Sequence, residues 1–280
     1  MFDCICVIGN GMLAKCCCKI LAEKHDNVIF FDANSSSSWY LKKQFESIQN
    51  VIYQWYDKSE IFEKILQLSG KILIISAVNP YIIPKSIVDN DRIEAINLHH
   101  SLLPLHPGRN AEAWTIYEED NYGGITWHNV TSTVDGGDII SSGVIELNDK
   151  MTSWKLLKIQ NDLAISEFSK FVDKLLEGNL QCRKQDNNEE CKMHYSYEKP
   201  NGGIFDMQWP AKKMSAFLRA MDYGPAKVLG NPQIQIENKI FEIIKYTIND
   251  IQSEKEEIVN MKNRVQIKKD NLEINLYIQD

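Results

Sequence analysis

Three polar residues in the middle of the chain have the side chains needed for hydrogen-bonding and proton-transfer chemistry. Asn97 and His99 are two residues apart, and Asp135 follows in a glycine-rich turn. If Ala95–Leu98 is the end of a short strand, the alternation of side chains along the strand sends Asn97 and His99 to the same face. The turn can then aim Asp135 back at them. Together they would offer an amide donor, a titratable ring and a carboxylate to one reacting group.

The segments before this motif alternate between apolar runs and helical spacing. Cys4–Ile8, Asn27–Phe31 and Lys71–Ile75 are short apolar runs, and Met12–Lys24 has apolar residues at helical spacing between the first two. Strand, helix and strand in succession are typical of a parallel sheet. The sequence therefore predicts an α/β fold with a Rossmann-like, mostly parallel sheet in its N-terminal part. A further strand is expected at Gly124–Val130.

The second half of the chain has a different pattern. Thr152 is a plausible helix N-cap, and Trp154–Leu176 has helical spacing. The polar stretch 181–192 then predicts a boundary between a first domain, 1–180, and a smaller second lobe, 193–280. Alternating strand patterns make this lobe β-rich, at Gln233–Ile236, Ile240–Tyr246, Val265–Lys268 and Leu272–Tyr277.

The motifs around the polar residues resemble those of the folate-dependent formyltransferases. N-x-H at 97–99 is followed by S-L-L-P at 101–104, G-x-T-x-H at 124–128 and V-D-x-G-x-I-I at 134–140. In this resemblance Asn97, His99 and Asp135 fall on the family's catalytic positions. The segment 203–220 is also similar, more loosely, to the second domain of methionyl-tRNA formyltransferases and amino-sugar N-formyltransferases.

The resemblance implies transfer of a formyl group from 10-formyltetrahydrofolate to a primary amine. In that reaction Asn97 and His99 would hold the formyl oxygen as negative charge develops on it, and Asp135 would orient His99 or a water and accept the amine's proton. His128 would be a supporting partner, whereas His100 and His106 would be ordinary loop residues. No metal ligands and no nicotinamide cofactor are expected.

The same resemblance places part of the folate pocket on the loop that follows the strand at 71–75. Two prolines, Pro80 and Pro84, keep this loop from regular pairing, so a plain surface turn is the alternative. Arg109 could bind either the donor or the acceptor. The residues expected to bind the cofactor are Val78, Asn79, Tyr81, Ile82, Leu102 and Arg109.

The turn Gly9-Asn10-Gly11 after the first strand could cradle a phosphate, as it does in dinucleotide-binding folds. The third glycine of that fingerprint is missing, so we expect a tight turn, and contact of its amides with an anionic part of the acceptor stays open. Asp32 falls near the ribose position of such folds, although the resemblance implies no nicotinamide.

Charge narrows the choice of acceptor. A net charge of −7 and a sequence pI near 5.5 disfavour a tRNA, because nucleic-acid binding depends mainly on Lys and Arg that neutralise phosphates. We expect a nucleotide-linked amino sugar. The alternatives are an amino acid, a peptide-like precursor or an aminoacyl-tRNA as acceptor, a formyltetrahydrofolate hydrolase, and a non-catalytic folate or nucleotide sensor. Assembly as a homodimer is a further option.

The remaining composition is typical of a cytoplasmic enzyme without membrane partners. No apolar run reaches the length of a membrane span, and the first residues read as a strand rather than a secretory signal. Seven cysteines, three of them consecutive at 16–18, fit a reducing compartment. A redox or metal site at 16–18 is disfavoured, because adjacent helical residues point about 100° apart.

Overall fold

A computed structural model describes residues 2–34, 39–185, 191–252 and 255–279. The chain divides into two compact units, each built from segments that are not contiguous in the sequence. Part of the polar stretch 181–192 lies outside the described residues, and the expected boundary between a domain 1–180 and a lobe 193–280 stays a prediction. The first unit consists of 1–107, 124–144 and 160–192, and the second consists of 108–123, 145–159 and 193–280.

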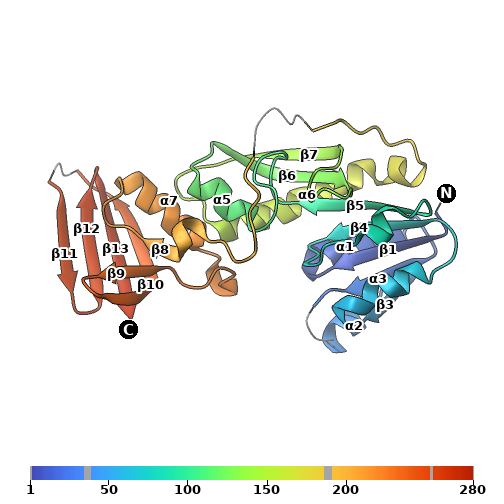
Figure 1. Ribbon diagram of the computed structural model, residues 1–280, viewed down its shortest axis with the longest axis horizontal. Coiled ribbons are helices and arrows are strands. Elements are labelled where there is room, and N and C mark those ends of the chain that lie inside the picture. Colours follow the sequence, from blue (N-terminus) through green and yellow to red (C-terminus); the bar gives the residue numbers. More distant parts are fainter. Residues whose placement is uncertain (1, 35–38, 186–190, 253–254, 280) are drawn as a thin grey trace. The chain divides into compact units, whose positions relative to one another are not determined.

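A seven-stranded sheet forms the centre of the first unit, and its strand order is β3-β2-β1-β4-β5-β6-β7 (Figure 1). The pairs from β3 to β5 are parallel, and β5 pairs with β6 in the antiparallel sense. The expected Rossmann-like, mostly parallel sheet is thereby confirmed. The strands are β1 (Cys4–Gly9), β2 (Val28–Asp32), β3 (Val51–Trp55), β4 (Ile72–Ala77), β5 (Ile93–His99), β6 (Tyr122–Asn129) and β7 (Ile139–Glu146).

The central strands are buried on both faces, which explains why they read as unbroken apolar runs. β3 was not expected from the sequence, because it mixes polar and apolar residues and is only partly buried. Neither α2 nor α3 was expected. The helices are α1 (Gly11–Ala22), α2 (Trp39–Glu46), α3 (Lys58–Leu66), α4 (Lys85–Val88), α5 (Ala111–Tyr117), α6 (Ser153–Leu176) and α7 (Ala211–Met221), with short 3-10 turns at Pro200–Gly203 and Gly224–Ala226.

The consecutive cysteines lie on α1. Cys17 and Cys18 are fully buried in the core between α1 and the sheet, while Cys16 is half-buried. Burial raises the pKa of the Cys17 and Cys18 thiols, so both stay protonated and behave as small apolar side chains. The structure gives this triplet a packing role.

The second unit is built on a six-stranded sheet with the order β11-β12-β13-β10-β9-β8. Its core contains α7, whose Phe217 and Leu218 are fully buried, and the half-buried Trp209, which packs against Phe205 and Phe217. The β-rich character of this lobe matches the expectation, but β8 and β11 were not predicted. Its strands are β8 (Ile204–Phe205), β9 (Gln233–Ile236), β10 (Lys239–Asp250), β11 (Glu257–Met261), β12 (Arg264–Lys269) and β13 (Leu272–Gln279).

Buried polar contacts hold α5 and the start of α6 in this second unit. The Tyr223 hydroxyl donates to the Glu112 carboxylate at 2.8 Å, and the Ser153 hydroxyl donates to the carbonyl of Ala220 at 2.6 Å. Buried hydrogen bonds of this kind are costly to break because the groups left behind are cut off from water. They explain why segments from the middle of the sequence belong to the C-terminal compact unit.

Candidate active site

Asn97 lies on β5 with its amide held on both sides. The Ser76 hydroxyl, at the end of β4, donates to Asn97 Oδ1 at 2.7 Å, and Asn97 Nδ2 contacts Nε2 of His128 at 3.1 Å. Ser76 and Asn97 are directly paired in the sheet, as are Asn97 and His128. The amide orientation is therefore fixed by its neighbours. Its second N–H remains available as a donor to a ligand.

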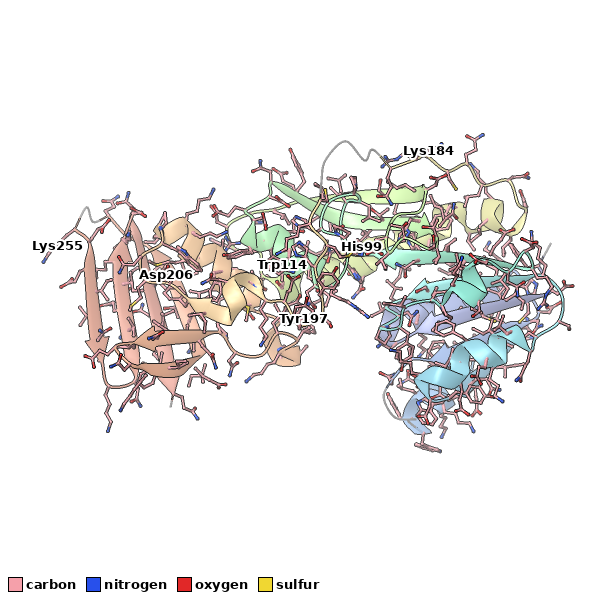
Figure 2. The ribbon with its side chains drawn as sticks, in the orientation of Figure 1. His99, Trp114, Lys184, Tyr197, Asp206 and Lys255 are labelled. Carbon is pink, nitrogen blue, oxygen red and sulfur yellow. The ribbon has the colours of Figure 1, made fainter. Side chains whose placement is uncertain are left out.

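His99 is the last residue of β5 (Figure 2). Its side chain is buried. Its Nε2 lies 2.8 Å from the carbonyl oxygen of His106, which can only accept, so Nε2 carries a hydrogen. In the neutral ring the lone pair is then on Nδ1. This atom lies 3.5 Å from Asp135 Oδ2.

His128 on β6 repeats this arrangement. Its Nδ1 lies 2.9 Å from the carbonyl oxygen of Asn129 and must donate to it, which leaves the lone pair of the neutral ring on Nε2. That lone pair accepts from the Asn97 amide and lies 3.5 Å from Asp135 Oδ1. His128 thus orients the Asn97 amide and lies close to Asp135.

Asp135 lies between the two rings, in a turn whose geometry constrains the choice of residue. Its φ is +52°, a left-handed conformation that Asp and Asn tolerate better than most residues. Gln185 Nε2 donates to the carbonyls of Asp135 and Gly137 at 2.6 and 2.7 Å and so ties the turn down. A Cβ on Gly137 would lie 1.8 Å from the carbonyl oxygen of Asn129, so the turn passes β6 too closely for any side chain there.

The two imidazole lone pairs and the carboxylate converge on one place. Both ring N–H groups are committed to backbone carbonyls, and the His128 Nε2 lone pair already accepts from the Asn97 amide, so an added proton would lie between Asp135 and Nδ1 of His99. Burial lowers the pKa of His99, while the Asp135 charge opposes that shift. The cluster is arranged to take up a single proton and share it.

The structure brings Asn97, His99 and Asp135 together in the first unit. Strand alternation predicted the common face of Asn97 and His99, and the glycine-rich turn predicted the approach of Asp135. Three supporting residues were not singled out beforehand: Ser76, Gln185 and, through its backbone carbonyl, His106. Ser76 alone carried a signal in the sequence, since it is the one polar residue of the otherwise apolar strand β4. The other two are recognisable only once the chain is folded.

The loop after β4 carries four of the residues expected to bind the cofactor. Val78 has φ +58°, which is rare for a β-branched residue and marks a strained backbone where the loop leaves the sheet. Asn79 holds the loop by accepting from the Tyr81 N–H at 2.9 Å, and the Tyr81 hydroxyl donates to the Ala33 carbonyl at 3.2 Å. Ile82 is 72% exposed. This is an ordered loop with an apolar tip, and its contact with a folate stays a prediction.

Leu102 and Arg109 occupy different surroundings. Leu102 is half-buried and covers Gly124, where a Cβ would lie 2.5 Å from the leucine side chain, so it contributes to packing as well as to any pocket. Arg109 belongs to the second unit, where its backbone N–H donates to the His194 carbonyl at 2.9 Å. Their roles in ligand binding stay predictions.

The glycine turn after β1 has a packing explanation. A Cβ on Gly9 would lie 1.7 Å from the carbonyl oxygen of Ala77 on the neighbouring strand, and Gly11 opens α1 with φ +70°. Asp32, at the end of β2, is fully buried and accepts from the Tyr53 hydroxyl at 2.6 Å. Asp32 is thereby engaged inside the protein, and the turn needs no phosphate to account for its glycines.

Comparison with known proteins agrees with these motifs. Residues 33–169 match the sequence profile described as formyl transferase, a segment that contains the whole Asn97, His99 and Asp135 cluster. This segment belongs to the formyl transferase family. The family assignment made from the motifs is confirmed.

The matches to two relatives span less than two thirds of the relatives' own length. A GDP-perosamine N-formyltransferase of Brucella melitensis is 28% identical over 153 residues, which are 55% of this chain and 58% of the relative. A methionyl-tRNA formyltransferase of Clostridium novyi is 25% identical over 211 residues, 73% of this chain and 64% of the relative.

Solved structures show the same fold along the whole chain. The Helicobacter canadensis N-formyltransferase, in complex with folinic acid and dTDP-3-aminofucose, aligns with a TM-score of 0.75 at 16% identity and full coverage of both chains. WlaRD, a sugar 3N-formyl transferase with dTDP and 5-N-formyl-THF, aligns with a TM-score of 0.74 at 18% identity, covering 100% of this chain and 99% of its own. In the part of this chain that the structure describes, none of the helices has the length and apolar character to cross a membrane.

Proposed function

We propose that this protein is an N-formyltransferase that moves the formyl group of 10-formyltetrahydrofolate to the amine of a nucleotide-linked amino sugar. The observation that carries the proposal is the convergence of Asn97, His99, His128 and Asp135 at the ends of β5 and β6. The donor set fits the reaction, because it offers one oriented N–H for an oxygen and one buried place for a proton.

Asn97 would bind the formyl oxygen through its second amide N–H. Loss of one such donor typically costs about 3 kcal/mol of transition-state stabilisation. His99 was expected to bind the same oxygen, but its Nε2–H is committed to the His106 carbonyl and its Nδ1 faces Asp135. A donor role for His99 would require its ring to leave that carbonyl. The geometry favours Asn97 as the oxygen's partner and His99 as part of the proton path.

Asp135 would accept the proton that the amine loses as its nitrogen bonds to the formyl carbon. The bond between that carbon and the folate nitrogen then breaks, and the same proton is returned to the leaving nitrogen. His99 would hold the proton in place meanwhile, because its Nδ1 lone pair faces the carboxylate, while His128 keeps the Asn97 amide oriented. 10-Formyltetrahydrofolate would supply the activated formyl carbon, so this chain's residues need only orient groups and move one proton.

An amino-sugar acceptor has support from two directions. Both full-length structural relatives are described with a thymidine diphosphate ligand, and one of them with an amino sugar attached. The net charge of −7 speaks against a tRNA, although methionyl-tRNA formyltransferases are among the sequence relatives. A nucleotide-linked sugar needs few phosphate contacts and is compatible with an acidic protein.

The proposal is tested by incubating the purified chain with 10-formyltetrahydrofolate and a panel of amines. The panel contains dTDP- and GDP-linked amino sugars, free amino acids and methionyl-tRNA, and mass spectrometry records which amine gains a formyl group. Formylation of a nucleotide sugar alone is the expected result. Tetrahydrofolate release without any amine would indicate a hydrolase, and donor binding without turnover in any reaction would indicate a sensor.

A further inference from the structure

A wide groove lies in the second unit, and its lining contains none of Asn97, His99 and Asp135. It has a volume of about 890 Å³ and is bordered by α7, the first turn of α6, the loop before β9 and strand β10. Small-molecule sites commonly have volumes of roughly 300–1,000 Å³. Figure 1 shows α7 and β10 in orange and red, within the C-terminal part of the chain. The groove is large enough for a metabolite.

A buried arginine lines this groove without a carboxylate partner. Arg219 on α7 is only 8% exposed, and its guanidinium donates from Nε to the Ser215 hydroxyl and from Nη1 to the Met151 carbonyl, both at 3.1 Å. Among the described residues, no ion pair joins Arg219 to a carboxylate, and Asp149, Tyr246 and Glu119 act on its charge only through longer-range electrostatics. Burial lowers the pKa of Arg219, which reflects the cost of holding this charge among neutral groups.

The rest of the lining adds positive charge. Six cationic side chains line the groove against three carboxylates, in a chain whose net charge is −7. Lys212 is paired with Glu119, Lys155 donates to the carbonyl of Lys150, and the ammonium of Lys245 lies over the Tyr277 ring. The exposed Lys150 and Lys227 and the buried Arg219 remain as cations that could meet a ligand. The groove is thus a basic region on an acidic protein, which attracts anions.

Two further features bear on the kind of anion. The first turn of α6 borders the groove, and the N–H end of a helix carries partial positive charge, although the N–H groups of Trp154 and Lys155 already donate to the Asp222 carbonyl and the Thr152 hydroxyl. Trp154, half-buried beside Gly224, and Ile244, which is 51% exposed, give part of the lining an apolar character. A planar guanidinium suits the oxygens of a phosphate, and the apolar surface suits the organic part of such a molecule.

We propose that this groove binds the phosphate group of a small phosphorylated molecule, with Arg219 as the buried anchor and Lys150 and Lys227 at the rim. The site is separate in its residues from the Asn97, His99 and Asp135 cluster, all of which lies in the first unit. The proposal does not depend on formyl transfer. A negative result for phosphate binding in this groove therefore does not contradict the proposed formyl transfer, and the reverse also holds.

The test uses the full-length protein and inorganic pyrophosphate, a probe that carries phosphates without a base or sugar. Calorimetry measures its affinity, and hydrogen–deuterium exchange locates it. Pyrophosphate should slow exchange in peptides covering 149–155 and 212–224. We expect Lys150→Glu to weaken binding at least fivefold and Arg219→Gln at least tenfold, while the matched control Lys239→Glu, on β10 but outside the groove lining, changes it less than twofold.

Lys150 is exposed, so its substitution keeps the test decisive even if the buried Arg219→Gln variant fails to fold. Equal binding by wild type and Lys150→Glu would overturn the proposal, as would protection confined to peptides outside the groove. Binding of an RNA oligonucleotide without binding of pyrophosphate would also overturn it, because the groove would then belong to a nucleic-acid surface.

Discussion

Replacing Asp135 by Asn isolates the charge of this carboxylate from its shape. The residue has φ +52°, and Asn tolerates that conformation, whereas Ala would add roughly 1–2 kcal/mol of backbone strain and confuse the result. The side chains of Asp135 and His99 are 9% and 7% exposed and lie 3.5 Å apart. At an effective dielectric constant of about 20, a carboxylate and a protonated ring at that distance attract by about 5 kcal/mol.

This attraction exists only when the cluster holds the proton, so its loss raises the barrier rather than weakening substrate binding. Because the Asn dipole retains part of the interaction, we expect kcat to fall about a thousandfold, with the donor KM changed less than about threefold. Steady-state kinetics with the amine identified by the screen measure both constants. Val134→Ala, at an exposed neighbouring position, is the matched control. If folded Asp135→Asn keeps kcat within tenfold of wild type, Asp135 does not accept the proton.

Four further outcomes are expected. Ser76→Ala removes the 2.7 Å bond that orients Asn97 and should lower kcat about tenfold, with recovery in Ser76→Thr; unchanged kinetics would show that the amide needs no such support. Because burial lowers the pKa of His99, the unfolded chain takes up a proton there before the folded protein does, and the free energy of unfolding measured in urea should fall as the pH drops below about 6.5. His99→Gln should reduce the slope of that free energy against pH by up to about 1.4 kcal/mol per pH unit, and an unaltered slope would contradict the burial argument. Gly137→Ala should cost roughly 2 kcal/mol in urea unfolding, because its methyl would lie 1.8 Å from a strand carbonyl, whereas Gly123→Ala should be much milder; equal effects would refute the close approach. Formyl transfer should survive chelator treatment and dialysis, and activity lost to a chelator but restored by a divalent ion would reveal a metal.

The sequence alone was sufficient for the parts of this protein that depend on local pattern. Unbroken apolar runs predicted the central strands, because strands buried on both faces need apolar side chains at every position. The two-residue spacing of Asn97 and His99 placed both on one side of β5 for the same local reason. The motifs around Asp135 indicated the formyltransferase family. Segments with mixed polarity, such as β3 and α2, were not predicted, because they are only partly buried and their apolar residues therefore follow no clear strand or helix period.

Only the tertiary structure decided how these residues work together. The proton positions on His99 and His128 follow from the carbonyls of His106 and Asn129, and a backbone carbonyl leaves no mark in a sequence. The orientation of Asn97 depends on Ser76, 21 residues away on a neighbouring strand. The positive charge of the groove around Arg219 could not be predicted from the sequence either, because its cationic side chains come from separate segments of the chain. A buried cation differs from a surface arginine only through the neighbours that folding brings to it or withholds from it.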